Sequence, residues 1–493
     1  MIPLSLAQIA TITGACMDQV ADSRVFVSGP VVIDSRRAGP GGLFAALPGE
    51  HVDGHDFAPA ATAAGAVAVI AARPVGVPAL IVPDVAGALA RLARAVVDGL
   101  DGVTIVGITG SSGKTTTKDL LAQVAQRLGP TVAAAGSFNN ELGHPLTVLR
   151  ADEQTRYLIL ELGARGRGHI AQLCQIAPPR LGAVLNVGRA HVGDYFADRD
   201  EVAQAKGELV EALPADGVAV LNADDRAVAE MAHRTAARVV TFGFGDAADV
   251  RAADVVLDDQ ARPAFRLVMA GRSAAVRLNL RGEHNVSNAL AVAALAGGLG
   301  MDPGGIADAL SAAVARSRWR MEVTRRPDGV TVINDAYNAN PESMRSALSA
   351  LRSMTSSARG GRAVAVLGYM AELGRNAEEW HEEVGALAAR TGVTSLIVVG
   401  DEATPMLAGA KSVRDWRGDL LHVPDGRAAV SVLARTLGPG DVVLVKASRA
   451  AGLEQAALAL LEPLATDGAH SEGAHSEGAH SEGAHDRGGE VAQ

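Results

Sequence analysis

Cysteine and aromatic residues are scarce in this chain of 493 residues, and each shortage restricts what the protein can be. The only two cysteines, Cys16 and Cys174, form neither a metal-binding spacing nor a disulfide framework, which is compatible with a reducing compartment. Aromatic residues make up 3% of the chain and hydrophobic residues 48%, so the cores must be built mostly from alanine, valine and leucine.

Long apolar runs and an excess of basic charge are also missing. No run approaches the roughly 20 apolar residues that a membrane span requires, and the first residues do not read as a signal peptide. The net charge of −10 and the pI near 5.7 argue against binding nucleic acid through a general basic surface. We therefore expect a cytoplasmic protein of about three domains, at ~150 residues each, that binds no nucleic acid and spans no membrane. We also expect a monomer, although no sequence feature indicates the oligomeric state.

Lysine is limited to five positions, and arginine supplies nearly all the positive charge. A lysine side chain can be modified or deprotonated, which arginine does not permit, so retained lysines are candidates for chemistry. Lys206 and Lys446 are the candidates among them. Taken locally, Lys206 lies in a helical pattern over residues 201–210, where a lone lysine is usually a solvated surface group.

The most informative stretch is residues 103–117, which read VTIVGITGSSGKTTT. An apolar β-branched run, a glycine-rich loop and a helical pattern follow one another, as a phosphate-binding loop requires. Lys114 would neutralise phosphates and Thr115 would bind Mg²⁺. The generic spacing fails by one residue, because Ile108 stands where the first glycine is usual, whereas the tighter pattern GxTGxxGKTT fits. The predicted nucleotide contacts are Thr109, Gly110, Ser111, Ser112, Gly113, Lys114, Thr115 and Thr116.

Short apolar runs continue after this loop at residues 157–160, 181–187 and 218–221, separated by helix-length sequence. This alternation predicts a parallel sheet, in which ligands collect at the carboxyl ends of the strands. Glu161 and His191 fall at such ends, beside the predicted phosphate loop. Either residue alone fits an ordinary strand-end or loop position, but together they suggest a Mg²⁺ environment.

The flanking segments are also α/β in pattern. Residues 1–99 form a small α/β unit, in which Ser35 and Arg36 follow a strand and fit either an anion-binding turn or a solvated one. Strands are expected at residues 330–333, 363–367, 396–399 and 442–445, with Pro341 opening a helix. In the helix expected within residues 281–300, Asn285 and Asn288 share a face, although Asn285 also fits a simple cap.

At this point the sequence resembles the Mur ligases, the ATP-dependent amide-bond-forming family of peptidoglycan synthesis. The resemblance covers nearly all of residues 23–461. It is carried by the motifs GITGSSGKTTT (107–117), NNELGHP (139–145), LELGA (160–164), NVGRAHVG (186–193), AQAKGEL (203–209), GEHNVSNALA (282–291), RWRME (318–322), NDAYNANP (334–341) and LVKASR (444–449). Further stretches, VIDSRRAGPGGLF (32–44), DGHDF (53–57) and LGYMAELG (367–374), are similar to the members that add D-alanyl-D-alanine to the UDP-N-acetylmuramoyl tripeptide.

The GAHSE-repeat tail (466–493) has almost no apolar surface to bury and is expected to be disordered. The resemblance implies an α/β fold with a UDP-sugar-binding domain (1–100), a central P-loop ATPase domain with a parallel sheet (101–315) and a Rossmann-like ligase domain (316–465). It also implies ATP and two Mg²⁺ ions as cofactors. Thr115 and Glu161 would hold one Mg²⁺, and His191 and a carbamylated Lys206 the second, with Lys114 among the catalytic groups. Nucleotide contacts would come from Asn288, Arg320 and Asp335, and substrate contacts from Ser35, Arg36, Asn338, Asn340 and Lys446.

Three positions depart from the family pattern, and two alternatives stay open. Tyr369 stands where relatives usually carry Asp, Ala447 replaces a usual glycine, and Ser111-Ser112 replaces a common Thr-Asn pair. The first alternative is another amide ligase, either the tripeptide-forming relative, whose DNPR-like stretch is absent here, or a folylpolyglutamate synthase. The second is a nucleotide-dependent switch without ligase chemistry, against which Glu161, His191 and Lys206 together argue.

Overall fold

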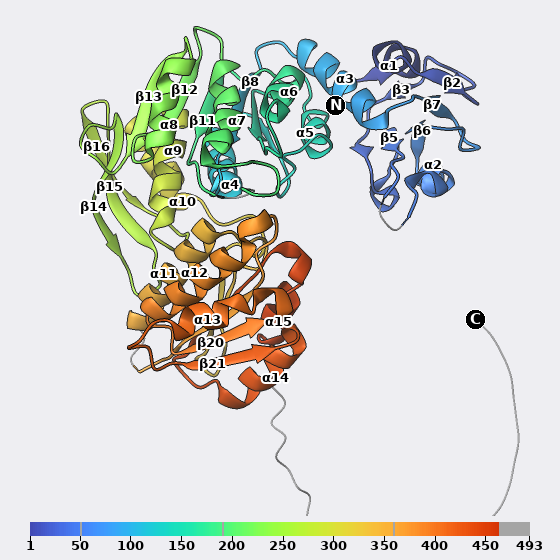
Figure 1. The fold of residues 1–493 in the computed structure, drawn as a ribbon. Helices are drawn as coiled ribbons and strands as arrows, with labels where there is room; N and C mark the ends of the chain where they lie inside the picture. The colour runs from blue at the N-terminus through green and yellow to red at the C-terminus, as the bar shows by residue number, and fades with distance from the viewer. Residues whose placement is uncertain (50–51, 190–191, 358–359, 463–493) are drawn as a thin grey trace, which may run out of the picture.

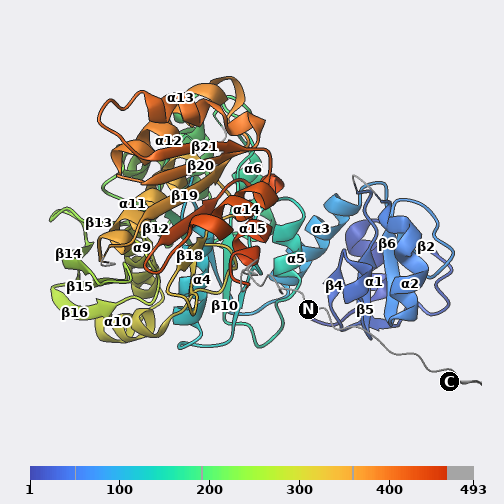
Figure 2. The same cartoon turned by 90° about the horizontal axis from the view of Figure 1, so that it is seen from below.

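A computed structural model describes residues 1–49, 52–189, 192–357 and 360–462 of the chain. Three successive regions each contain their own sheet, and the N-terminal region stands to one side of the other two (Figures 1 and 2). The domain boundaries proposed from the sequence remain predictions, and the GAHSE tail lies outside the described residues. Among the described helices, none has the length and apolar content needed to cross a membrane.

The N-terminal sheet has five strands in the order β2-β7-β6-β5-β4, and all neighbours are parallel except β2 and β7. Its strands are β2 (Cys16–Asp18), β4 (Val31–Val32), β5 (Gly42–Ala45), β6 (Ala66–Ala71) and β7 (Ala79–Ile81). Helices α1 (Leu6–Thr13), α2 (Ala58–Ala63) and α3 (Val85–Asp98) cover it. Leu89 and Leu92 of α3 share one hydrophobic cluster with Leu158 and Leu160 of the central region, so α3 joins the two.

The central region contains nine strands in the order β16-β15-β14-β13-β12-β11-β8-β10-β9. The pairings from β9 to β14 are parallel. The alternating apolar runs predicted this arrangement for β8, β10, β11 and β12, whereas β9 and β13 were not predicted. The parallel strands are β8 (Thr104–Thr109), β9 (Thr131–Ala133), β10 (Tyr157–Glu161), β11 (Leu181–Val184), β12 (Val218–Asn222) and β13 (Arg238–Gly243). The predicted phosphate loop follows β8, and Glu161 is the last residue of the neighbouring strand β10, so both lie at the same edge of the sheet.

An antiparallel extension completes this sheet and was not predicted from the sequence. It comprises β14 (Val250–Leu257), β15 (Pro263–Met269) and β16 (Arg272–Arg277). Buried Phe265, Leu267 and Met269 alternate with less buried residues along β15, which is the period of a half-buried strand, and the spacing of these apolar residues was the available sequence signal. Ala270 and Gly271 join β15 to β16 with φ of 50° and 70°, the left-handed pair that a tight hairpin turn requires.

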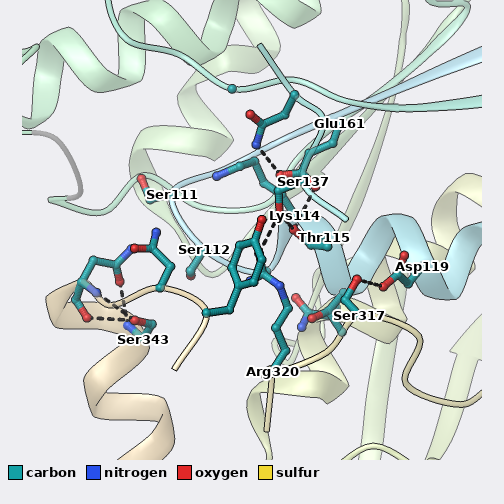
Figure 3. Close-up of a pocket in the computed structure, with 18 of the residues that line it drawn as sticks. Ser111, Ser112, Lys114, Thr115, Asp119, Ser137, Glu161, Ser317, Arg320 and Ser343 are labelled. Carbon is teal, nitrogen blue, oxygen red and sulfur yellow. Dashed lines mark hydrogen bonds between the residues drawn. The ribbon is translucent and has the colours of Figure 1, made fainter. Parts of the chain in front are cut away.

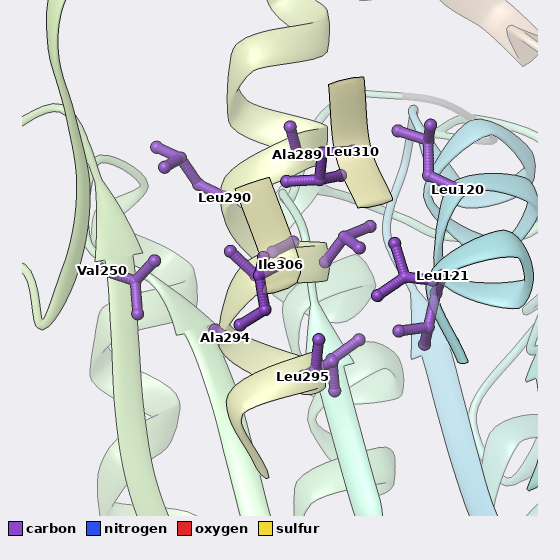
Figure 4. Close-up of a cluster of buried hydrophobic side chains, with 14 of the residues drawn as sticks. Leu120, Leu121, Val250, Ala289, Leu290, Ala294, Leu295, Ile306 and Leu310 are labelled. Atoms are coloured by element: carbon purple, nitrogen blue, oxygen red, sulfur yellow. The ribbon is translucent and has the colours of Figure 1, made fainter. Parts of the chain in front are cut away.

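The core of the central region is formed around α9 (His284–Gly298), which lies against α4 (Lys114–Ala125) and α10 (Pro303–Ala312) (Figure 4). Ala289, Leu290 and Leu295 are fully buried within it. Alanines allow the helices to approach closely, so packing rather than aromatic bulk fills the interior. The expectation of aromatic-poor cores is confirmed, because Phe242 and Phe265 are the only phenylalanines in this cluster.

The C-terminal sheet has six strands in the order β17-β18-β22-β19-β20-β21, parallel except for the edge pair β17 and β18. The four predicted strands are present as β18 (Thr331–Asn334), β19 (Ala363–Gly368), β20 (Ser395–Val399) and β22 (Val442–Lys446). The edge strands β17 (Glu322–Arg325) and β21 (Asp419–Val423) were not predicted. Pro341 opens α11 (Pro341–Ser357) as expected, and α12 (Ala377–Arg390) follows β19.

Candidate functional site

A pocket of about 620 Å³ lies between the central and C-terminal regions (Figure 3). The central region contributes the residues after β8, the end of β10, α7 (Arg199–Glu211) and the start of α9. The C-terminal region contributes Asp335, the start of α11 and Lys446. Residues predicted from separate motifs therefore line one cavity, which is large enough for a nucleotide-sized ligand.

The glycine-rich loop turns directly into α4, whose N-terminus carries Lys114. Gly113 has φ of 81°, and a Cβ there would lie 2.4 Å from Oδ1 of Asn288, so both the backbone conformation and the space require glycine. Lys114 Nζ donates to the carbonyl of Gly110 at 2.7 Å. Thr109 is fully buried and its hydroxyl donates to Leu162 O, and neither Thr109 nor Gly110 lines the pocket.

Asn186, which the sequence analysis did not select, shapes this loop. Its Oδ1 accepts hydrogen bonds from the amides of Ser111 at 3.0 Å and Ser112 at 2.9 Å. The Ser111 hydroxyl in turn accepts from the amide of Gly188 at 2.8 Å. The first two loop amides are thus paired with protein, which leaves the amides from Gly113 onward nearest the helix N-terminus for phosphate oxygens. The position of Asn186 just after β11 was the available signal.

Thr115 and Glu161 form the oxygen-rich part of the site. Thr115 Oγ1 donates to Glu161 Oε2 at 2.9 Å, and Asn139 donates to Glu161 Oε1 at 2.7 Å. Ser137 Oγ lies 2.9 Å from Thr115 Oγ1 (Figure 3). Mg²⁺ prefers oxygen ligands and commonly uses one or two carboxylates together with substrate phosphates and water, so this donor set fits that ion.

The second predicted metal position is only partly described. His191 lies outside the described residues. No group of three or more His, Cys, Asp or Glu side chains suited to a metal occurs within the described parts of the chain. A cation at Thr115 and Glu161 would therefore depend on hydroxyl, phosphate or water oxygens for its remaining ligands.

Lys206 is buried at 4% exposure and faces the pocket, so the interpretation as a solvated surface lysine is wrong. Burial, followed by the nearby positive charge of Lys114, holds the pKa of Lys206 well below its usual value. Burial also lowers the pKa of Lys114, and the charges of Glu161 and Arg320 act on it in opposite directions. The Lys206 amine is therefore deprotonated more readily than that of an exposed lysine.

Arg320, Asp335 and Lys446 approach the pocket from the C-terminal side. Arg320 donates to Ser137 Oγ at 2.8 Å and its guanidinium lies 4.2 Å from the ring centroid of Tyr337. Lys446, 2% exposed, forms an ion pair of 2.7 Å with Asp335 and also donates to Asn338 O at 2.8 Å. These bonds fix the charged groups in place before any ligand is present.

The asparagines near the pocket have distinct roles. Asn288 donates to Asn285 Oδ1 at 3.0 Å, which confirms that they share a face. The capping interpretation of Asn285 is wrong, because Glu283 is the N-cap of α9 and Asn285 donates back to Arg281 O. Asn340 lines the pocket and also caps α11, since its Oδ1 accepts from the Ser343 amide at 2.8 Å.

Ser35 and Arg36 lie apart from this cluster and do not line the pocket. They belong to a short 3₁₀ turn (Ser35–Arg37), where the largely exposed Arg36 pairs with Asp34 at 2.9 Å. The departures at Tyr369 and Ala447 also do not line the pocket. Tyr369 accepts a backbone hydrogen bond from Ser448 at 3.0 Å, and Ala447 is fully buried.

Three family models match the chain in succession. They are described as Mur ligase family, catalytic domain (residues 30–97), Mur ligase middle domain (residues 108–296) and Mur ligase, glutamate ligase domain (residues 319–449). The middle-domain match contains the phosphate loop and Lys206. The third match contains Arg320, Asp335 and Lys446.

Individual proteins match over nearly the whole chain. The UDP-N-acetylmuramoyl-tripeptide–D-alanyl-D-alanine ligase of Mycobacterium tuberculosis is 50% identical, over 94% of this chain and 98% of its own length. The ligase of the same name from Escherichia coli is 34% identical, over 94% and 99%. A crystal structure of MurF from Acinetobacter baumannii has a TM-score of 0.83 at 30% identity, over 94% and 99%. MurF from Thermotoga maritima in complex with ADP has a TM-score of 0.75 at 28% identity, over 89% and 98%.

Proposed function

The chain belongs to the Mur ligase family, and from this premise we propose that it joins D-alanyl-D-alanine to the UDP-N-acetylmuramoyl tripeptide with ATP. The product is the pentapeptide precursor of peptidoglycan, with ADP and phosphate. The observation that carries this function is the 50% identity to ligases of that name over 94% of the chain. The pocket supports it, because phosphate-binding, carboxylate and cationic groups from two regions face one cavity.

The chemistry follows from the weakness of a carboxylate as an electrophile. A terminal carboxylate oxygen of the tripeptide attacks the γ-phosphorus of ATP, giving an acyl phosphate and ADP. The amine of the dipeptide then attacks the acyl carbon, the carbon–oxygen bond breaks, phosphate leaves and one proton is released. Lys114 and Arg320 lie where they can stabilise the negative charge of the transferring phosphoryl group.

ATP and Mg²⁺ are the cofactors of this activity. When bound, Mg²⁺ neutralises phosphate charge and orients the oxygens of the phosphoryl group. Thr115 and Glu161 would hold one ion, because their oxygens are adjacent and face the pocket. Lys114 of the central region and Arg320 of the C-terminal region line the same part of the pocket, so the phosphates would lie between them.

A second Mg²⁺ site and a carbamylated Lys206 are finer parts of the proposal. A carbamate forms when a neutral amine attacks CO₂, which joins nitrogen to carbon and releases one proton. The lowered pKa of Lys206 supports this step, because the neutral amine forms more readily than it does in an exposed lysine. His191 would complete the site with the carbamate.

Substrate contacts and assembly are also proposals. Asn288 would face the adenine, and Arg320 and Asp335 would bind the nucleotide from the C-terminal region. Asn338, Asn340 and Lys446 would contact the tripeptide or the dipeptide. Ser35 and Arg36 would bind the UDP end, so the substrate would extend from the N-terminal region into the pocket. A monomer in the cytoplasm, where ATP is supplied, completes the proposal.

Phosphate release from ATP tests the function directly. The purified protein is supplied with the UDP-N-acetylmuramoyl tripeptide, with and without D-alanyl-D-alanine, and products are weighed by mass spectrometry. Release that needs both substrates and a product heavier by the dipeptide is expected. Release with the muramoyl dipeptide and a free diamino acid would assign the preceding ligation step instead. ATP binding without acceptor-dependent release would favour the nucleotide switch.

A further inference from the structure

Residues 186–189, here called the coupling segment, lie between the phosphate loop and the C-terminal region. On one side, Asn186 binds the amides of Ser111 and Ser112, and the amide of Gly188 donates to the Ser111 hydroxyl at 2.8 Å. On the other side, the amide of Arg189 donates to Glu342 Oε1 at 2.8 Å. The coupling segment is therefore hydrogen-bonded both to the phosphate loop and to the C-terminal region.

Glu342 packs directly on the backbone of Gly188. A Cβ on Gly188 would lie 2.6 Å from the Glu342 carboxyl carbon and 2.7 Å from its Oε1, closer than real Cβ contacts allow. Glu342 belongs to the first turn of α11, where the helix dipole favours a carboxylate. Its Oε2 is buried and has no hydrogen-bond partner among the described residues, so the bond to Arg189 fixes the position of the carboxylate.

The Arg189 side chain gives the coupling segment a second attachment to the same region. Its guanidinium lies 4.4 Å from the ring centroid of Trp380, and Nη1 lies 3.9 Å from Glu383. Both partners belong to α12, while Glu342 belongs to α11. Two helices of the C-terminal region therefore hold one residue of the coupling segment.

We propose that Glu342 is a positioning residue for the nucleotide loop, acting through the coupling segment on Ser111. Glu342 does not line the pocket, so it acts on nucleotide through other residues. In the arrangement seen here, the Glu342 carboxylate of the C-terminal region holds Gly188 and Arg189 in place. The amide of Gly188 in turn holds the Ser111 hydroxyl. Nucleotide affinity then depends on the position of the C-terminal region. The inference rests on the proposed function, in which this loop binds the phosphates of ATP.

The test measures ADP affinity by calorimetry in the full-length protein carrying Glu342→Ala, Gly188→Ala or both. Gly188→Ala is expected to weaken ADP binding about tenfold, because its Cβ pushes the carboxylate away. Glu342→Ala is expected to weaken binding about fivefold. The double variant should bind no more weakly than Glu342→Ala alone, since removal of the carboxylate makes room for the Cβ.

Two further variants distinguish the proposed action of Glu342 through the coupling segment from a general loss of folding. Glu342→Gln keeps an oxygen that can accept from Arg189 and should retain ADP affinity within about twofold. Glu379→Ala removes an exposed carboxylate from α12 and should leave ADP affinity unchanged. Thermal unfolding of each variant reports whether it is folded, and the Glu342 variants alone decide the question if Gly188→Ala does not fold.

The outcomes distinguish this inference from the proposed function. If the unmodified protein binds no ADP, the proposed function is wrong, and the positioning role of Glu342 is wrong with it. If the unmodified protein binds ADP but Glu342→Ala binds it equally well, only the positioning role of Glu342 is overturned. Additive losses in the double variant would also overturn it, because they would show that Gly188 and Glu342 act independently.

Discussion

Arg320 donates a 2.8 Å hydrogen bond to the hydroxyl of Ser137, which joins the C-terminal region to the expected metal site. Ser137 Oγ also lies 2.9 Å from Thr115 Oγ1, whose own partner is Glu161. The fully buried Lys118 holds the backbone just before Ser137, because it donates to Ala134 O at 2.6 Å and to Gly136 O at 2.8 Å. A continuous set of hydrogen bonds thus connects the Arg320 guanidinium of the C-terminal region with the Glu161 carboxylate of the central region.

We predict that Ser137→Ala lowers kcat about tenfold, because a hydrogen bond to a charged group contributes roughly 1.5–3 kcal/mol and tenfold is about 1.4 kcal/mol. The Mg²⁺ concentration for half-maximal rate should rise as well. Ser137→Thr keeps the hydroxyl and should recover most of the rate. Ser431→Ala, which removes a hydroxyl bonded within the exposed face of α14 (Gly426–Thr436), is the control. An unchanged kcat in Ser137→Ala would contradict the role of this bond.

Asn186→Ala should weaken ADP binding about tenfold. The Ser112 amide loses its acceptor and the Ser111 amide keeps only the backbone carbonyl of Asn186. Each lost hydrogen bond contributes about 0.5–1.5 kcal/mol, so the loop relaxes away from its phosphate-binding shape. Calorimetry with ADP measures the effect. Asn222→Ala is the matched control, because Asn222 donates to the neighbouring Leu185 O without contacting the loop. Equal losses of ADP affinity in both variants would argue against a specific role for Asn186.

Lys206→Ala should abolish ligase activity, and short carboxylic acids should restore part of it if a carbamate is the active form. The rate of the unmodified enzyme should rise with added bicarbonate in buffer first cleared of CO₂. Steady-state phosphate release measures both effects. Activity of Lys206→Ala equal to that of the unmodified enzyme would exclude the carbamate.

The lowered pKa of Lys206 also predicts a pH dependence of stability in CO₂-free buffer. Between the folded pKa and the usual 10.5, the unfolded chain binds more protons than the folded chain, so stability rises with pH across this window. Lys206→Met removes the titrating group. We therefore expect it to raise the free energy of unfolding more at pH 7 than at pH 10, measured by urea denaturation. The opposite order would contradict the lowered pKa.

His144 predicts a loss of stability in acid. It is fully buried in α5 (Gly143–Val148), and burial lowers its pKa from 6.5 to about 4. The unfolded chain therefore takes up a proton between pH 6.5 and about 4 that the folded chain does not. At roughly 1.4 kcal/mol per pH unit, about 3 kcal/mol of stability is lost over this interval.

Urea denaturation at pH 7.5 and pH 4.5 measures this loss against a His144→Gln variant. The variant is expected to show a smaller difference between the two pH values, whatever its stability at pH 7.5. His233→Gln, at an exposed position, should keep the full difference. Equal differences in all three proteins would contradict a buried neutral His144.

Local sequence patterns were sufficient for the most deeply buried parallel strands and for the phosphate loop. Residues 157–160 and 218–221 are apolar on both faces, and strands buried on both faces need that pattern whatever surrounds them. The strands β9, β13, β17 and β21 and the extension β14 to β16 were missed, because partly exposed strands carry a weaker apolar signal. Asn186 was missed because an asparagine after a strand has many ordinary roles.

By itself the sequence determined the family, the alternation of strands and helices, and the set of residues able to bind phosphate and Mg²⁺. These follow from residue type and spacing along the chain, which set backbone conformation and chemistry locally. Only the tertiary structure decided that Lys206 is buried with a lowered pKa, that Asn186 binds the loop amides, and that Glu342 rests on Gly188. Each of these depends on distance and exclusion of water between segments far apart in sequence, which no local pattern encodes.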